Sequence, residues 1–129
     1  MSDPDANSVA EVTVLVAHGS RSAVANETHL DLCRDLSDRL GRPVRPAFLE
    51  LAEPSIEDAV DEAAAGGAEQ VTVLPYFLLP GNHTGRDIPA AVDAARLRHP
   101  TLAVSLARYL GAEPAIVDLV ADVITRGAS

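Results

Sequence analysis

The sequence predicts an α/β domain in which one four-stranded parallel sheet is flanked by helices on both faces, in the order βαβαβαβα. Two observations predict this fold. Short apolar, β-branched runs alternate with longer segments of helical periodicity, which is the pattern of parallel strands joined by crossover helices. The chain has 129 residues, of which 47% are hydrophobic and 22% charged, as in one globular domain. We therefore expect a flexible acidic tail over residues 1–10 and a single domain over residues 11–129.

The first strands and helix are marked by a change of periodicity along the chain. Residues 12–17 (VTVLVA) form an uninterrupted apolar run, typical of a strand that is buried on both faces. Residues 22–40 carry apolar side chains at helical spacing, and Gly41 is a suitable stop signal. Residues 44–49 predict the second strand. Because Pro46 lacks a backbone donor, it favours an edge position for this strand.

The rest of the chain continues the alternation. Ser55 is a suitable N-cap for the second helix, whose first turn contains the acidic residues Glu57 and Asp58. An unusual loop, residues 75–86 (PYFLLPGNHTGR), follows the third strand. The remaining expected elements are strands over residues 71–74 and 101–106 and helices over residues 55–65, 87–98 and 113–126.

Composition argues against several classes of partner. The chain has 19 acidic and 10 basic residues and a formal net charge of −9, with no Trp and only two Tyr and two Phe. Nucleic-acid binding depends on clustered positive charge and often on aromatic stacking. The single cysteine, Cys33, cannot form an internal disulfide or a multi-thiolate metal site. Because neither a signal peptide nor a membrane-spanning stretch is evident, we expect a cytoplasmic protein with no nucleic-acid or membrane partner.

Three chemically capable side chains are expected at one edge of the sheet. In open α/β sheets, ligands bind beyond the carboxyl ends of the strands, where the strand order changes direction. With a strand order of 2-1-3-4, His18 after the first strand, Glu50 after the second and His83 after the third share that edge. Two imidazoles and a carboxylate suit a divalent cation such as Fe, Co, Ni or Zn. The ordinary alternative for each is a loop histidine or a solvated carboxylate.

The other candidate residues are interpreted as structural. His29 lies in the middle of a helix beside its apolar stripe, and Cys33 is most simply a small buried hydrophobe. His99 follows a helix, whose negative end suits a partly protonated imidazole. Gly19 and Ser20 are placed where a phosphate can bind a helix N-terminus. The chain nevertheless lacks the glycine-rich nucleotide-binding patterns, any lysine, and the G-x-S-x-G pattern of a nucleophilic serine.

Several short motifs occur in a fixed order between about residues 12 and 110. They are AHGSR at 17–21, FLE at 48–50 with PSI at 54–56, LPYFL at 74–78, GNH at 81–83 and DIP at 87–89. This ordered set resembles the small, half-size sirohydrochlorin cobaltochelatase and ferrochelatase family of the class II chelatases. The resemblance implies a homodimer that inserts Co²⁺ or Fe²⁺ into sirohydrochlorin without ATP, towards cobalamin or sirohaem. The metal (Co²⁺, Fe²⁺ or Ni²⁺) is then a substrate, and no permanently bound cofactor is expected.

The resemblance also implies roles for individual residues. His18 and His83 match the two metal-binding, catalytic histidines of the family, and Glu50 matches a catalytic acidic residue that assists metal or proton handling. Because sirohydrochlorin is rich in carboxylates and the chain is itself acidic, arginines near the histidines are expected to contact it. Apolar residues after the third strand are expected to pack against the macrocycle. The expected substrate-binding residues are Ser20, Arg21, Tyr76, Phe77, Leu78, Gly81 and Arg86.

Two other functions fit the same residues. One is a non-catalytic carrier of divalent metal that uses the same histidines, and the other is an interaction module in which the histidines are incidental. A chelatase and a carrier both bind metal, but only the chelatase binds the tetrapyrrole selectively and turns over. The sequence does not choose the metal, because affinity at almost any nitrogen and oxygen site follows the Irving–Williams order.

Overall fold

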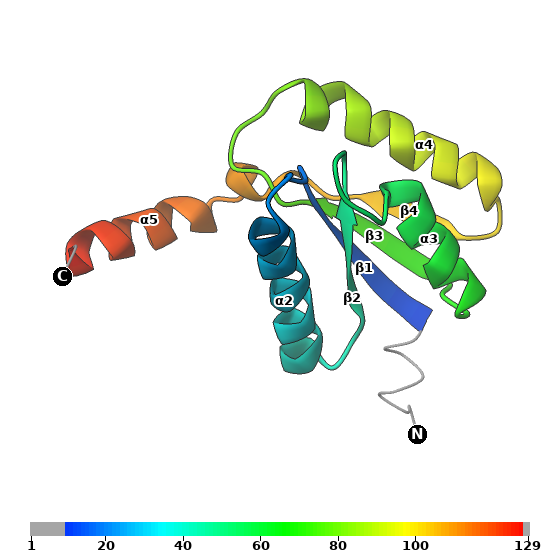
Figure 1. Cartoon of the computed structure of the whole chain (residues 1–129), viewed down its shortest axis with the longest axis horizontal. Coiled ribbons are helices and arrows are strands. Elements are labelled where there is room, and N and C mark those ends of the chain that lie inside the picture. The colour runs from blue at the N-terminus through cyan, green and yellow to red at the C-terminus, as the bar shows by residue number, and fades with distance from the viewer. Residues whose placement is uncertain (1–9, 128–129) are drawn as a thin grey trace.

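The computed structural model of the chain describes residues 10–127 and contains one four-stranded parallel sheet (Figure 1). The spatial order of the strands is β2-β1-β3-β4, so β2 lies at an edge. The predicted fold class, the strand order and the edge position of the second strand are therefore confirmed. The acidic tail predicted over residues 1–10 lies, apart from Ala10, outside the described residues. The strands are β1 (Glu11–Ala17), β2 (Val44–Phe48), β3 (Gln70–Pro75) and β4 (Ala103–Leu106).

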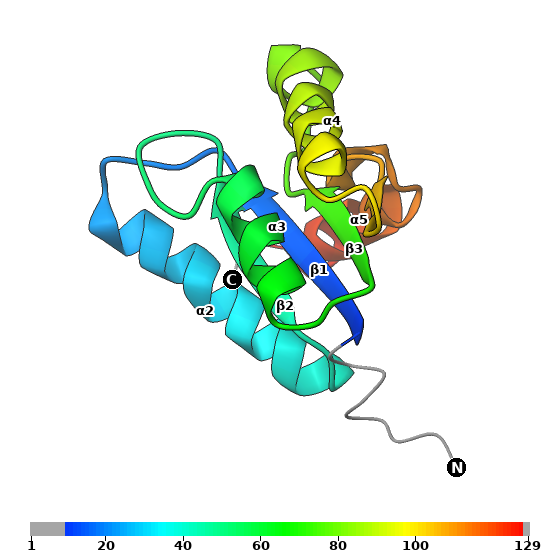
Figure 2. The ribbon, with the colours of Figure 1, turned by 90° about the vertical axis from the view of Figure 1, so that its right-hand side faces the viewer.

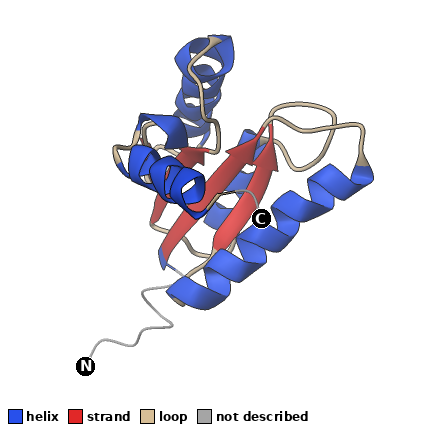
Figure 3. Ribbon diagram, turned by 90° about the vertical axis from the view of Figure 1, so that its left-hand side faces the viewer, coloured by secondary structure: helices blue, strands red, loops and turns tan. Residues whose placement is uncertain are grey.

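Helices lie on both faces of the sheet, but they cover the two faces unequally (Figures 2 and 3). Two helices pack against one face and against each other, while a single long helix packs over β2 and β1 on the opposite face. The last helix extends away from the body of the molecule. In chain order, the helices are α2 (Ala23–Leu40), α3 (Ile56–Ala65), α4 (Ile88–Arg98) and α5 (Ala115–Arg126).

The main core lies between the sheet and the pair α3 and α4. Alternate residues of β1 point towards these helices, and Val14 and Val16 are fully buried there. Val71 and Val73 of β3 occupy the same layer and are also fully buried. On the opposite face, Leu15 belongs to a smaller core under α2. The sheet thus has a buried core on each face, and it positions the loops at its carboxyl edge.

Two helix boundaries follow the predicted signals, the start of α3 at Ser55 and the end of α2 at Gly41. The Ser22 hydroxyl accepts a hydrogen bond from the Ala25 backbone N–H at 3.3 Å and caps α2. Ser55 caps α3 in the same way, with the Asp58 N–H as donor at 3.1 Å. Gly41 ends α2 in the left-handed conformation, with φ +66°. No helix among residues 10–127 is long and apolar enough to cross a membrane.

The three residues interpreted as structural, His29, Cys33 and His99, are buried or hydrogen-bonded to another element of the fold. His29 is buried, and its Nε2–H donates to the backbone oxygen of Leu15 at 2.9 Å, while burial lowers its pKa. Cys33 is also buried, and burial raises the pKa of its thiol to about 11. His99 follows the last turn of α4, and its Nε2–H donates to Asp61 of α3 at 2.6 Å.

Candidate active site

The loop after β1 lies directly against the loop after β2, and this contact brings His18 and Glu50 together. Gly19 has φ +96°, and a Cβ at this position would overlap the backbone oxygen of Glu50. Only glycine therefore permits so close an approach. The Glu50 N–H donates to the His18 backbone oxygen at 3.1 Å, and Nε2–H of His18 donates to Oε1 of Glu50 at 2.7 Å. Backbone and side chain together hold the two residues as a pair.

His83 opens a π-helical turn, η1 (His83–Asp87), that leads directly into α4. The Ile88 N–H donates to the His83 backbone oxygen five residues earlier, which is the hydrogen bond of a π-turn. Within this turn, Nδ1–H of His83 donates to Oδ2 of Asp87 at 2.9 Å. The prediction of a loop over residues 75–86 is therefore wrong for residues 83–86, which belong to the π-turn directly before α4. Turns of this type are frequent at functional sites.

The two imidazoles come together although they are far apart in the sequence. The ring centroids of His18 and His83 are 4.7 Å apart, with the ring planes inclined by 76°. The Phe77 ring lies beside both, with centroid separations of 6.4 Å from His18 and 6.1 Å from His83. The parallel order of β2, β1 and β3 places all three loops at one edge of the sheet. The structure therefore brings together His18, Glu50 and His83 as predicted, and their catalytic roles stay predictions.

Each imidazole has a carboxylate partner that fixes its orientation. The bonds to Glu50 and Asp87 use one nitrogen of each ring and leave Nδ1 of His18 and Nε2 of His83 outside them. A hydrogen bond from the Arg86 guanidinium, and then one from His83, hold the pKa of the Asp87 carboxyl below its ordinary value. Asp87 is therefore a carboxylate at neutral pH. The four site side chains are 38% to 54% exposed, so a substrate can reach them.

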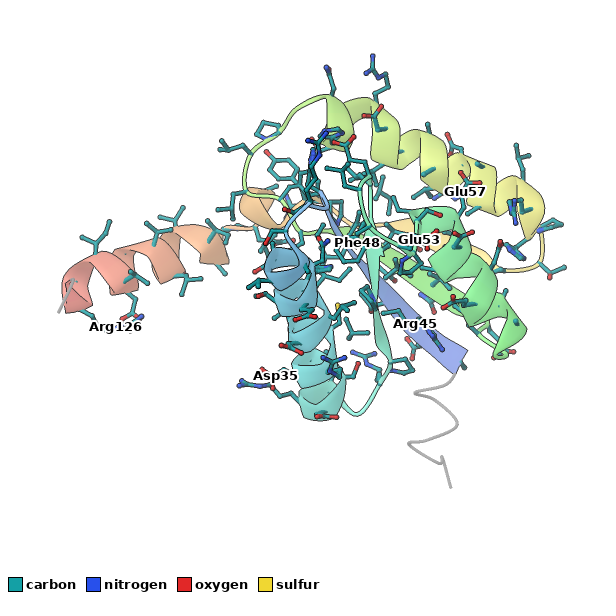
Figure 4. The ribbon with its side chains drawn as sticks, viewed as in Figure 1. Asp35, Arg45, Phe48, Glu53, Glu57 and Arg126 are labelled. Atoms are coloured by element: carbon teal, nitrogen blue, oxygen red, sulfur yellow. The ribbon has the colours of Figure 1, made fainter. Side chains whose placement is uncertain are left out.

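Two hollows of different chemistry meet at the histidines. One, of about 270 Å³, is lined by His83, by three carboxylate side chains, those of Glu50, Glu57 and Asp87, and by apolar side chains from β2, α3 and α4. Figure 4 labels Glu57, on α3, and Phe48, at the end of β2, which both line it. The other hollow, of about 320 Å³, is lined by His18 and by the apolar run Tyr76, Phe77, Leu78 and Leu79. The site thus has an acidic side and an apolar side.

The described residues contain no set of three or more His, Cys, Asp or Glu side chains arranged to hold a metal ion. What the site offers a divalent ion is the pair of imidazoles, His18 and His83, which suits borderline metals such as Co²⁺ or Fe²⁺.

The predicted substrate-binding residues divide into two groups. Tyr76, Phe77 and Leu78 line the apolar hollow, and Tyr76 and Leu78 are exposed there. Arg21 is exposed on the loop after β1, whereas Arg86 makes an ion pair with Asp87 at 3.2 Å. Tyr76, Phe77 and Leu78 thus lie beside His18, and the contacts of all five side chains with a substrate stay predictions.

Ser20 and Gly81 make hydrogen bonds within their own loops. The Ser20 N–H donates to Oδ1 of Asn26 at 3.0 Å, and its hydroxyl accepts from the Ser22 N–H at 3.0 Å. The Gly81 N–H donates to Oγ1 of Thr84 at 3.0 Å. These bonds shape the two loops that present the histidines.

Sequence reasoning missed Asp87 and Glu57 as members of the site. Asp87 is the partner of His83, and the spacing of four residues between them is the one signal that was available. Glu57 was interpreted as an acidic residue of a helix first turn, and its position there does not reveal that the turn faces the histidine loop.

Comparison with known proteins decides the family. The profile of the CbiX family matches residues 12–127 of the chain. The chain belongs to the CbiX family. Chloroplastic sirohydrochlorin ferrochelatase of Arabidopsis thaliana is 35% identical over 114 residues, which are 88% of this chain and 51% of that relative. Sirohydrochlorin cobaltochelatase of Methanopyrus kandleri is 38% identical over 78 residues, which are 59% of this chain and 54% of that relative. The matched segments thus span about half the length of these curated relatives.

Solved structures share the fold. A putative cobalamin (vitamin B12) biosynthesis CbiX protein from Marinobacter aquaeolei has a TM-score of 0.78 and 33% identity, covering 90% of this chain and 95% of that one. Sirohydrochlorin chelatase SirB from Bacillus subtilis, solved in complex with cobalt, has a TM-score of 0.79 and 28% identity. That match covers 92% of this chain but 51% of the SirB chain. The family predicted from the ordered motifs is confirmed.

Proposed function

We propose that this CbiX-family protein inserts Co²⁺ or Fe²⁺ into sirohydrochlorin without ATP, in the synthesis of cobalamin or sirohaem. The observation that carries the proposal is the approach of His18 and His83 to 4.7 Å between ring centroids, each ring bonded to a carboxylate. The names of the relatives, sirohydrochlorin ferrochelatase and cobaltochelatase, support the same reaction. The metal is a substrate, and the proposal includes no permanently bound cofactor.

The acidic hollow is the proposed place of metal delivery. Glu50, Glu57 and Asp87 line it together with His83, so its field favours a hydrated divalent cation. In the proposal, the imidazoles of His18 and His83 then replace part of the water around the ion. Because both rings are already oriented by carboxylates, little ordering accompanies metal binding.

The apolar hollow is the proposed place of the macrocycle. Tyr76, Phe77 and Leu78 offer a surface for one face of the tetrapyrrole beside His18. In this proposal, Arg21 and Arg86 contact the carboxylates at its periphery, which offsets repulsion by a chain of net charge −9. Ser20 and Gly81 contribute through the loops whose shape they fix.

The reaction exchanges one divalent ion for two pyrrole N–H protons, so two protons leave the macrocycle. His18 with Glu50, and His83 with Asp87, are two adjacent routes by which those protons reach solvent. Glu50 is more than half exposed and is suited to release a proton to water.

We also propose that the protein works as a homodimer with the tetrapyrrole cleft between the two copies. The coverage of the SirB chain supports this pairing, because 92% of this chain covers 51% of that longer one. A cytoplasmic location and a single domain over residues 11–129 stay predictions from the sequence.

The test is the anaerobic absorbance of sirohydrochlorin mixed with Co²⁺, Fe²⁺ or Ni²⁺, with and without the protein. We expect the wild-type chain to accelerate insertion and His18→Ala and His83→Ala each to lose about 100-fold or more of that acceleration. Acceleration that survives both substitutions would place the reaction elsewhere in the molecule.

The same samples separate the enzyme from the metal carrier. A carrier binds Co²⁺ through the two histidines, and the wild-type chain then leaves the insertion rate equal to that of the protein-free control. The names of the relatives favour the enzyme.

A further inference from the structure

His29 is a buried polar side chain that the proposed reaction does not use. The residue is 6% exposed, and its Nε2–H donates to the Leu15 backbone oxygen at 2.9 Å. Nδ1 of the same ring is buried and has no hydrogen-bond partner among the described residues. A buried acceptor without a partner is unfavourable, and an apolar side chain of similar shape would avoid that loss. Core packing alone therefore does not explain a histidine here.

The His29 ring lies beside aromatic residues at the ends of two strands that lead to the site. Its centroid is 5.8 Å from that of Tyr76, directly after β3, with the ring planes inclined by 35°. It is 5.3 Å from that of Phe48, the last residue of β2, with the planes inclined by 66°. Aromatic rings at these separations attract each other beyond the burial of apolar area. Because Leu15 belongs to β1, His29 joins α2 to all three strands that precede the site loops.

Tyr76 and Phe77 are supported from opposite faces of the sheet, because successive residues of an extended strand point to opposite faces. Phe77 packs against the main core, whereas Leu74, two residues before Tyr76, packs against the smaller core under α2. Tyr76 lies on the Leu74 side, is 44% exposed and lines the apolar hollow together with His18. Among the described residues, the His29 ring is the one aromatic neighbour of Tyr76. The orientation of the tyrosine in the hollow therefore depends on the imidazole.

We propose that His29 is a positioning residue for the macrocycle, which holds the Tyr76 ring as a wall of the apolar hollow. The proposal rests on the proposed function, because the hollow is the place assigned there to sirohydrochlorin. The hydrogen bond to Leu15 fixes the imidazole, and the imidazole in turn fixes the side of the tyrosine that it covers. The exposed side of Tyr76 is then available to the tetrapyrrole in one orientation. A wall that is ordered before binding increases affinity, because less side-chain freedom is lost.

The dissociation constant of metal-free sirohydrochlorin tests this role. His29→Gln retains a donor for Leu15 but removes the ring, and we expect the constant to rise about 2- to 10-fold, as for the loss of one aromatic pair. His29→Phe retains a ring beside Tyr76 and is expected to bind within about 2-fold of the wild type. Cys33→Ala is the matched control, because Cys33 is also buried on α2, one turn further from the site. Equal affinities of His29→Gln and wild type would overturn the proposal.

Steady-state kinetics separate positioning from a loss of folded protein. A variant that is only less folded has fewer active molecules, so its apparent kcat falls while KM for sirohydrochlorin stays the same. We expect the reverse for His29→Gln, in which KM for sirohydrochlorin rises and kcat and KM for Co²⁺ stay nearly unchanged. The reason is that the Tyr76 wall binds the macrocycle equally in the ground state and the transition state. A fall in kcat with an unchanged KM would contradict the proposal.

Near-UV circular dichroism reports on Tyr76 without any substrate. The chain has two Tyr and no Trp, so in a Tyr109→Phe background the tyrosine band arises from Tyr76 alone. We expect this band to weaken in His29→Gln and to persist in Cys33→Ala, and an unchanged band in His29→Gln would overturn the proposal. If the wild type binds sirohydrochlorin with the expected dependence on His29 but inserts no metal, the proposed function alone is overturned. If it inserts metal and His29→Gln binds sirohydrochlorin normally, the role of His29 alone is overturned.

Discussion

The two ends of α4 carry histidine–carboxylate pairs of the same chemistry in different surroundings. In the π-turn that leads into α4, His83 donates to Asp87 at 2.9 Å, and directly after the last turn of α4, His99 donates to Asp61 at 2.6 Å. Asp61 also accepts from Arg98, so this pair links α3 to the end of α4. Its side chains are 25% and 31% exposed, against 38% and 41% for His83 and Asp87.

The difference between the pairs lies in what surrounds them. His83 stands beside a second imidazole and between an acidic and an apolar hollow, at the carboxyl edge of the sheet. Among the described residues, His99 has no such aromatic or imidazole neighbour. A hydrogen-bonded histidine is therefore an indicator of function only together with its position in the fold.

The largest loss of activity is expected from a substitution at Gly19, where the loops of His18 and Glu50 are in direct backbone contact. Gly19→Ala forces apart the loops of His18 and Glu50, because its Cβ would overlap the Glu50 backbone oxygen. We expect metal insertion to fall about 100-fold, as a small displacement of reacting groups suffices for that. The measurement is the anaerobic absorbance assay.

Gly67→Ala is the matched control for this substitution. Gly67 has the same φ, +96°, but nothing lies within 4 Å of a Cβ there. We expect Gly67→Ala to keep its activity and to lose only about 1 kcal/mol of unfolding free energy, from the left-handed strain. Urea unfolding measures this loss. Equal activities of the two variants would contradict the importance of the loop contact.

The second largest effect is expected from the carboxylates of the two pairs, because their substitution should change the insertion rate at Asp87 but not at Asp61. Asp87→Asn removes the acceptor that orients His83, and such changes around metal-binding histidines typically cost 10- to 100-fold, so we expect a loss of about that size in insertion rate. Asp61→Asn leaves the rate unchanged and lowers the free energy of unfolding by about 1 kcal/mol or less. If both variants kept full activity, the orientation of His83 by Asp87 would make no contribution to the insertion rate.

A third histidine, His29, has no carboxylate partner among residues 10–127 and is expected to make stability depend on pH. Burial lowers its pKa below the ordinary 6.5, so the unfolded chain takes up a proton first as the pH falls. The stability present above pH 6.5 is therefore lost progressively below it, by about 1.4 kcal/mol per pH unit at most. Urea unfolding at several pH values measures this slope. His29→Gln, which does not titrate, is expected to remove it, and an unchanged slope would contradict the assignment.

The smallest effect is expected from the titration of Asp61. The hydrogen bond from His99, and then that from Arg98, lower the pKa of its carboxyl below 3.8. Its contribution is therefore complete above about pH 3.8 and is lost as the pH falls through the folded value. Because the pair is partly exposed, the change is a few tenths of a kcal/mol. The difference in unfolding free energy between wild type and Asp61→Asn measures it, and a difference that grows at low pH would contradict it.

Sequence reasoning reached the fold and the centre of the site because both follow from the strand order. Once β2, β1 and β3 are parallel neighbours, His18, Glu50 and His83 must share the carboxyl edge. It did not find Asp87, because residues 75–86 were interpreted as a loop, and the four-residue spacing from His83 to Asp87 brings the two side chains together only within a helical turn.

The position of α5 could not be predicted from the sequence either. The amphipathic pattern of residues 115–126 predicts a helix with an apolar side but does not identify the surface that this side covers. The close packing of Gly111 on Leu78, which directs the helix outwards, is a tertiary contact.

The most direct test of the account is to compare the initial rates of Co²⁺ insertion into sirohydrochlorin for His83→Ala and His99→Ala under identical anaerobic conditions. The account predicts a fall of about 100-fold or more for His83→Ala with little change in stability. It predicts a nearly wild-type rate for His99→Ala, with the free energy of unfolding lowered by about 1 kcal/mol. Equal rates for the two variants, or a greater loss in His99→Ala, would contradict the assignment of catalysis to the paired histidines at the carboxyl edge of the sheet.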